Sequence, residues 1–224
     1  MSGRSPRWIS VKRTTKIGSL PVGTSVKLSV NGALLEFLVV QQGLPSDVYD
    51  ASCDGTWLLM KDIYENRAWN STATNTYESS TINTYLNADF CNMFDAAVQN
   101  AIKQAKIPYR AGTGSGGTDK SGANGLPCKA FLLSAAELDI TGTSDPVNGS
   151  VLAYFADAGN AKRIATLNGA TELWWARTPS NTTSSAVRVS RNGGRNTTEV
   201  TTESGVRPAI ILSSDFRVTD DMLA

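Results

Sequence analysis

A long polar stretch lies between two largely apolar segments near the C-terminus of this chain. From Thr178 to Ser204, fifteen of twenty-seven residues are Ser, Thr or Asn, and none is aromatic. Leu173-Trp174-Trp175 precedes the stretch and Val206 to Leu212 follows it, and both segments have the composition of a protein core. Interchangeable polar residues between two core-forming anchors predict a surface displayed on a fixed scaffold, which favours binding over catalysis.

The size and charge of the chain limit its class. Its 224 residues, 41% of them hydrophobic, suffice for one large domain or two small ones with a core. With 21 basic and 20 acidic residues the net charge is +1, which gives no electrostatic basis for binding nucleic acid or an anionic membrane. No apolar run reaches the roughly 20 residues that span a bilayer, and the basic residues 1–7 are not followed by an apolar secretion segment. We therefore expect a soluble protein, made in the cytoplasm without a signal peptide.

The chain contains no histidine, which removes Ser-His-Asp catalysis, Cys-His catalysis and His-bound zinc together. An enzyme would have to work with carboxylates, Lys or Tyr. The three cysteines, Cys53, Cys91 and Cys128, are widely spaced and form no C-x-x-C motif, so we expect buried thiols. The acidic residues between 47 and 65 could supply a carboxylate pair or a calcium cage, but solvated turn positions explain them better. We predict no metal and no cofactor.

A glycine-rich segment formally satisfies a nucleotide-binding motif. Residues 112–117 read G-x-G-x-x-G, but the motif binds dinucleotides only between a strand and a helix. Here it follows Pro108-Tyr109-Arg110 and continues into more glycine-rich sequence. We therefore expect an exposed loop from Ala111 to Gly125.

Local patterns predict strands at both ends of the chain and helices between them. Asn31-Gly32 between the apolar segments 25–30 and 34–40 indicates a β-hairpin, and residues 56–62 suggest a further strand. Apolar residues at helical spacing from Thr81 to Lys106, with a break near Asn87-Ala88-Asp89, indicate two consecutive helices closed by Pro108.

The C-terminal part reads as four short strands, at 172–177, 186–189, 199–201 and 206–212, with a hairpin turn at Asn192-Gly193-Gly194. Ser134-Ala135-Ala136-Glu137 matches a capping box and predicts the start of a short helix. Together these patterns favour an α+β domain.

Two features next to the polar stretch have a structural and a functional interpretation. On a strand, Trp174 and Trp175 point to opposite faces, so one indole enters the core. The other either stacks beneath the displayed region or packs in the core as well. For Arg207 we expect an anchor for backbone carbonyls rather than a ligand contact.

Several segments together carry a resemblance to a known family. They are residues 128–134, Leu167-Asn168-Gly169, Trp174-Trp175-Ala176-Arg177-Thr178-Pro179 and residues 205–212. The chain resembles phage and prophage proteins of gut Firmicutes with a WW-x-R-[ST]-P … G-V-R-P-A domain. Several of these are similar to the variable proteins of diversity-generating retroelements. The resemblance covers about residues 27–212. It implies a C-type-lectin-like fold, as in formylglycine-generating enzymes, with short antiparallel strands, two to three helices and long loops.

The resemblance also implies how the chain is divided. Residues 1–24 would be a leader, residues 25–215 the C-type-lectin-like domain with a variable region at about 174–208, and residues 216–224 a tail. Retroelements of this kind mutate template adenines, and Asn codons then give Ser or Thr by single changes.

We call the positions that the resemblance marks as variable and ligand-binding the display positions: Ala176, Thr178, Ser180, Asn181, Thr182, Thr183, Ser184, Arg188, Ser190, Arg191, Asn192, Arg195, Asn196, Thr197, Thr198, Glu199, Thr201 and Thr202. We call the positions that it marks as fixed the framework positions: Trp174, Trp175, Arg177, Pro179, Val187, Val189, Gly193, Gly205, Arg207 and Pro208.

Three hypotheses about function follow. The first is a non-enzymatic receptor-binding protein of a phage or prophage, associated with the virion, that contacts a protein or glycan on a target cell. The second is a structural virion or tail protein whose polar stretch is merely solvated. The third is an enzyme of the formylglycine-generating type or a carboxylate-based hydrolase, which is disfavoured because the chain has no histidine and no cysteine pair follows Cys128. The chain could also form a homo-oligomer.

Overall fold

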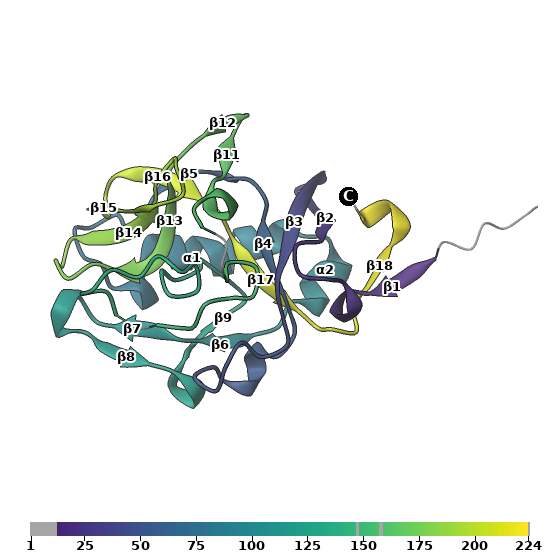
Figure 1. Ribbon diagram of the computed structural model, residues 1–224, viewed down its shortest axis with the longest axis horizontal. Helices are drawn as coiled ribbons and strands as arrows, with labels where there is room; N and C mark the ends of the chain where they lie inside the picture. Colours follow the sequence, from purple (N-terminus) through teal and green to yellow (C-terminus); the bar gives the residue numbers. More distant parts are fainter. Residues whose placement is uncertain (1–12, 147, 157–158, 224) are drawn as a thin grey trace, which may run out of the picture.

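The computed structural model describes residues 13–146, 148–156 and 159–223, which build two five-stranded sheets surrounded by smaller elements (Figure 1). The first sheet has the strand order β10-β17-β4-β3-β2 and the second has the order β15-β14-β13-β16-β5. The strands of the first sheet are β2 (Ser25–Val30), β3 (Ala33–Gln42), β4 (Thr56–Met60), β10 (Ala130–Phe131) and β17 (Ala209–Leu212). The strands of the second sheet are β5 (Glu65–Ala68), β13 (Trp174–Pro179), β14 (Ser185–Val189), β15 (Arg195–Glu199) and β16 (Glu203–Val206).

Short pairs of strands and short helices complete the described part of the chain. Four strand pairs lie outside the two sheets: β1 (Thr14–Lys16) with β18 (Arg217–Thr219), β6 (Ala105–Ile107) with β9 (Leu126–Cys128), β7 (Tyr109–Ala111) with β8 (Thr118–Lys120), and β11 (Thr166–Leu167) with β12 (Ala170–Thr171). The α-helices are α1 (Thr81–Ala88) and α2 (Ala96–Ala101). The 3-10 turns are η1 (Ile17–Ser19), η2 (Ala51–Cys53), η3 (Tyr77–Ser79), η4 (Phe90–Met93), η5 (Gly114–Gly116), η6 (Gly122–Asn124), η7 (Ala161–Arg163) and η8 (Asp220–Met222).

The predicted N-terminal hairpin is confirmed. β2 and β3 pair in register up to Val30 opposite Ala33. Asn31 and Gly32 form the turn with φ angles of 50° and 78°, which is the backbone that a two-residue hairpin of this hand requires. Residues of β2 alternate between half-buried and buried, so that one face of the hairpin enters the core.

One short segment joins the two sheets. The predicted strand at 206–212 divides at Pro208: β16 ends at Val206 in the second sheet and β17 begins at Ala209 in the first. β16 runs parallel to β13, with Gly205 opposite Trp174. A Cβ atom on Gly205 would lie 2.7 Å from the carbonyl oxygen of Leu173, so only glycine allows this approach.

Helical turns form in the predicted region, but they are much shorter than predicted and their predicted end is wrong. α1 stops at Ala88, within the predicted break, and Ser80 and Asp95 cap the two helices by accepting hydrogen bonds from backbone N–H groups. α2 already ends at Ala101, so Pro108 does not close it, and strand β6 lies between them.

The predicted α+β class with two to three helices is wrong. Of the described residues, 37% are in strands and 19% in helices, 3-10 helices included; the strands form several sheets, and nothing confirms a C-type-lectin-like fold. The helical stretch yields only helices of 8 and 6 residues. The segment expected as a loop, Ala111–Gly125, instead contributes β8, η5 and η6. The sequence of β8, Thr-Asp-Lys, shows no hydrophobic alternation, so the sequence pattern did not indicate this strand.

Described residues of the segments assigned to a leader and a tail take part in strand pairing. Thr14–Lys16 pairs with Arg217–Thr219, and Val26 of β2 forms a bridge with Leu223 (Figure 1). The segments Thr14–Lys16 and Arg217–Thr219 thus lie side by side near the first sheet. Within the described ranges, no helix is long and apolar enough to cross a membrane.

We predict that the three thiols are unreactive in the native protein. Cys53, Cys91 and Cys128 are free and buried, as expected from the sequence. Burial raises their pKa values to about 12, 11 and 12, respectively, so little thiolate forms at pH 8. Ellman's reagent should titrate no thiol in native buffer and all three in denaturant. Rapid reaction of one thiol before unfolding would contradict the buried placement.

Candidate functional site

Strand β13 is the fixed base of the C-terminal region. All six of its residues are buried, including both tryptophans. The indole N–H of Trp174 donates to the Arg163 carbonyl and that of Trp175 donates to the Arg67 carbonyl, each at 2.9 Å. Both indoles are therefore core side chains with their polar atom satisfied, and neither forms a stacking platform for a ligand.

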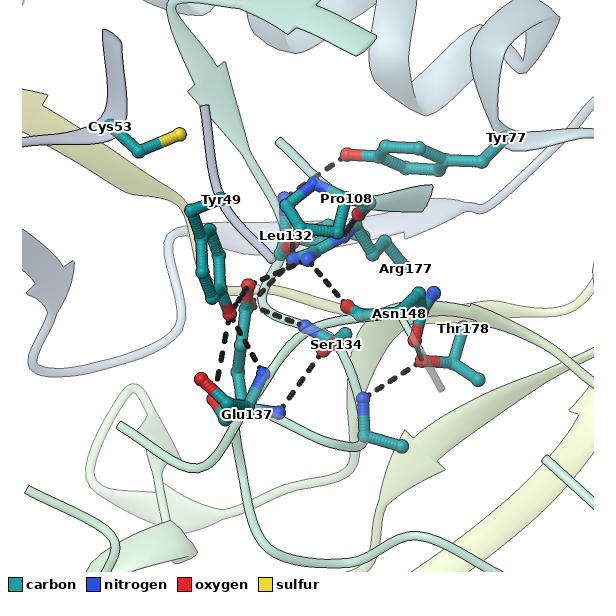
Figure 2. A network of polar contacts seen from close by, with 12 residues as sticks. Tyr49, Cys53, Tyr77, Pro108, Leu132, Ser134, Glu137, Asn148, Arg177 and Thr178 are labelled. Atoms are coloured by element: carbon teal, nitrogen blue, oxygen red, sulfur yellow. Dashed lines mark hydrogen bonds and ion pairs between the residues drawn. The ribbon is translucent and has the colours of Figure 1, made fainter. Parts of the chain in front are cut away.

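A buried ion pair holds β13 to the opposite loop (Figure 2). Arg177 and Glu137 are both 0% exposed, and the guanidinium Nη1 and Nη2 atoms each lie 2.6 Å from one carboxylate oxygen. Arg177 also donates to three carbonyls, those of Pro108, Leu132 and Asn148, at 2.9–3.0 Å. Burial lowers the pKa of Arg177, but the Glu137 carboxylate outweighs it and leaves that pKa above its usual value. The fork geometry uses all five guanidinium N–H groups.

Glu137 has a second role that the sequence pattern indicated in part. Its Oε2 accepts from the Ser134 N–H at 2.9 Å and the Glu137 N–H donates to the Ser134 hydroxyl at 3.1 Å, which is the predicted capping box. The segment that follows makes a single turn and not the predicted helix. Oε1 of Glu137 also accepts from the Tyr49 hydroxyl at 2.9 Å (Figure 2). The carboxylate therefore links three parts of the chain instead of starting a helix.

The framework positions and the display positions separate by burial. All ten framework positions are buried. The display positions that are exposed are Asn181, Thr182, Thr183, Arg191, Asn192, Arg195, Thr197, Glu199, Thr201 and Thr202. The half-buried ones are Ser184, Arg188, Ser190, Asn196 and Thr198.

Three display positions lie inside the protein. Ala176 is fully buried. Thr178 is fully buried too, and its hydroxyl donates to Asn148 Oδ1 and accepts from the Ala135 N–H (Figure 2). Ser180 is 8% exposed and its hydroxyl lies 2.9 Å from that of Thr182. Ala176 and Thr178 thus belong with the framework and cannot touch a ligand in this conformation.

A shallow polar groove brings several display positions together. It has a volume of about 320 Å³ and is lined by Ser180, Asn181 and Thr182 from the β13–β14 turn, Ser185 from β14, and Arg195 and Thr197 from β15. Ser144 and Asp145 complete the lining. Sequence reasoning missed these two residues, because the acidic side chain sits in an irregular segment 50 residues from its partner Arg195.

The side chain of Asn75 fixes the turn that borders this groove. It is fully buried, and its Nδ2 donates to the carbonyls of Ser180, Thr182 and Ser185 at 2.6–3.0 Å. Its Oδ1 accepts from the Gly114 N–H at 2.9 Å. Asn75 thereby clamps the β13–β14 turn to the glycine-rich segment.

The glycine-rich segment supports the same turn from outside. Gly114 has a φ angle of 52°, and a Cβ atom on it would lie 2.7 Å from the Asn181 carbonyl oxygen. The Ser115 N–H donates to that same oxygen. The glycines therefore serve close packing of two backbones, a role that the motif pattern alone did not reveal.

The arginines of the displayed region are paired within the protein. Arg188 donates to Asn196 and Ser204, Arg191 pairs with Glu172 at 2.7 Å, and Arg195 pairs with Asp145. The hydrogen bond from Arg191 lowers the pKa of Glu172, and burial lowers the pKa of Arg188. The guanidinium groups of Arg188 and Arg195 thus have partners within the protein that orient them, whereas the Arg191 pair is largely exposed.

Comparison with known proteins gave one match. The model of one protein family, described as a domain of unknown function (DUF6273), matches residues 54–214, which is more than two thirds of the chain. A search of curated proteins and a search of solved structures gave no match.

We predict that Arg177→Met destabilises the protein strongly. The substitution leaves the Glu137 carboxylate buried without its counter-ion, which costs about 3–5 kcal/mol of unfolding free energy. Arg191→Met is the matched control, because its ion pair with Glu172 is partly exposed and such pairs contribute about 0–1 kcal/mol. Urea denaturation measures both. Equal losses in the two variants would contradict the role given to Arg177.

We also predict that Asn75→Ala loosens the β13–β14 turn. The carbonyls of Ser180 and Thr182 lose the Asn75 donor and the Gly114 N–H loses its acceptor, whereas the Ser185 carbonyl keeps the Ser180 N–H, at a total cost of about 2 kcal/mol. Hydrogen exchange of residues 180–185 should accelerate more than exchange in β3 or β4. Asn181→Ala, at an exposed position of the same turn, should leave exchange unchanged. Equal protection in the two variants would show that Asn75 does not hold the turn.

Proposed function

The chain belongs to the DUF6273 family, and we propose that it is a non-enzymatic receptor-binding protein that displays a diversified polar surface on a fixed, β-rich scaffold. The observation that carries this proposal is the separation by burial: every framework position is buried, whereas fifteen of the eighteen display positions are exposed or half-buried. Substitutions at the exposed positions change the surface without removing core contacts.

The chemistry of the groove supports recognition by hydrogen bonds. Its hydroxyl and amide side chains both donate and accept, so they can match a polar protein surface or a glycan. The turn at 180–184 is clamped by Asn75 and the glycine-rich segment. A pre-organised surface loses less conformational entropy on binding than a mobile loop.

The proposed origin of the surface is a diversity-generating retroelement of a phage or prophage, with a receptor on a target bacterial cell as the partner. Support comes from the Ser, Thr and Asn content of residues 178–204 and from the placement of those residues. A reverse transcriptase gene near the locus, with an adenine-biased near-repeat of the codons for Trp174 to Pro208, is the genomic feature that this origin requires.

Sequencing the locus across a host population tests the proposal. Substitutions should concentrate at the exposed display positions, while Trp174, Arg177, Gly205 and Arg207 stay fixed. Thr178 should also stay fixed, because it is buried and hydrogen-bonded. Evenly distributed substitutions would remove the recognition role and leave a structural virion protein.

A direct binding assay provides a second test. We expect Asn181→Ala combined with Thr197→Ala to weaken binding of the labelled protein to host bacterial cells about tenfold or more, because both residues line the groove. Ser79→Ala combined with Thr171→Ala is the matched control, since both residues are exposed and lie outside the groove. Flow cytometry measures the bound fraction. Equal binding of the two double variants would place the contact elsewhere.

A further inference from the structure

The outer edge of strand β15 is an open sheet edge. β15 is the terminal strand of the second sheet. In the first sheet, by contrast, both terminal strands are covered: β2 forms bridges with Leu223 and Phe94, and the Asn87 side chain binds backbone groups of Lys129 and Ala130 at β10. Proteins usually cover or block such edges, because free backbone groups invite another strand.

The register of β15 shows which of its backbone groups face outward. The Ser190 N–H donates to the Gly194 carbonyl and the Val200 N–H donates to the Ser184 carbonyl. Because hydrogen-bonded pairs alternate along an antiparallel ladder, residues 196 and 198 bond to β14, and residues 195, 197 and 199 point their backbone groups away from it. Among the described residues, the N–H groups of these three have no partner, and the Glu199 carbonyl accepts one bond, from Thr202.

The sequence of β15 complements itself. It reads Arg-Asn-Thr-Thr-Glu, with a cation at one end, an anion at the other and no proline. The side chains of Arg195, Thr197 and Glu199 are exposed and lie on one face of the sheet. Two such strands in antiparallel register, centred on Thr197, would place each Arg195 opposite a Glu199 and each Asn196 opposite a Thr198.

We propose that two copies of this chain associate by antiparallel pairing of their β15 strands around a two-fold axis at Thr197. The pairing joins the second sheets of both copies into one continuous sheet, and each outward N–H group gains a carbonyl partner. The contact is isologous, so it closes at a dimer. Arg195 can serve both its own Asp145 and the second copy's Glu199, because Asp145 occupies only Nε and Nη2 and Nη1 has no partner within the described ranges.

The dimer would affect how the proposed binding grooves act, but its formation does not depend on the proposed binding function. A two-fold axis perpendicular to the sheet places both grooves on the same face, since Arg195 and Thr197 line each groove. Two adjacent grooves would engage a repetitive surface with higher avidity than one. The pairing itself uses backbone groups and one charge pair, so it is tested with the purified protein alone.

Sedimentation velocity over a range of protein concentrations tests the pairing. A five-residue strand pair buries little area, so the dimer is weak and its population rises with concentration. Thr197→Pro removes the central outward N–H and leaves the β14 ladder intact, and it should abolish the dimer. Glu199→Arg places like charges opposite each other twice and should raise the dimer dissociation constant about tenfold or more.

Glu203→Arg is the control, because it makes the same change of net charge at an exposed residue of β16. This variant should dimerise like the wild type. A wild-type chain that stays monomeric at every concentration would overturn the proposal, as would a dimer that Glu199→Arg leaves unchanged. If Thr197→Pro fails to fold, as judged by circular dichroism, the comparison of Glu199→Arg with Glu203→Arg decides alone.

Discussion

The buried pair of Arg177 and Glu137 is the interaction on which the display region depends. A buried ion pair is tolerated only when all its polar atoms have hydrogen-bond partners. Here the Glu137 carboxylate accepts two N–H groups of Arg177, and carbonyls from three separate segments accept the other three. The pair therefore fixes the position of β13 relative to the turn after Ser134 and the strand that follows Pro108. Because β13 lies at the centre of the second sheet, the same contacts also fix where β14 and β15 carry their exposed residues.

This arrangement explains how a polar stretch with few core side chains of its own is fixed in position. Along β14 and β15 the core contacts come from Ala186, Val187 and Val189, whereas residues of β15 alternate between exposed and half-buried. The turn before β14 has no core side chain of its own between Asn181 and Ser184, so Asn75 replaces side-chain packing with bonds to its carbonyls. The scaffold thus holds the backbone of the turn and makes few demands on its side chains.

Elements whose sequence signal lies within a few residues could be predicted, whereas contacts between distant segments could not. Asn31-Gly32 and the helical spacing of apolar residues after Thr81 act within a few residues, and they indicated the hairpin and the position of the short helices. The α+β expectation failed because strands such as β6 and β9 pair across about twenty residues and, at three residues each, are too short for a hydrophobic period to stand out. In the site, Arg177 was marked only by the resemblance, as a framework position, and its partner lies 40 residues away and carried only a capping signature. Nothing near Asn75 indicated a partner more than 100 residues distant.

Arg177 and Arg207, the two buried arginines that flank the display positions after Thr178, keep a buried positive charge in different ways. Arg177 has a carboxylate and all its donors bound, so its pKa rises. Arg207 donates to the carbonyls of Met60 and Lys61, and its Cζ atom lies 4.8 Å from the centre of the Trp174 ring. Its buried Nη1 atom has no hydrogen-bond partner among the described residues. Burial lowers the pKa of Arg207 to about 10, so it remains charged at neutral pH. Both bind backbone carbonyls, whose positions do not change when side chains are substituted. Side-chain substitutions between Arg177 and Arg207 therefore leave these contacts intact, and the segment that connects β16 in the second sheet to β17 in the first keeps its position.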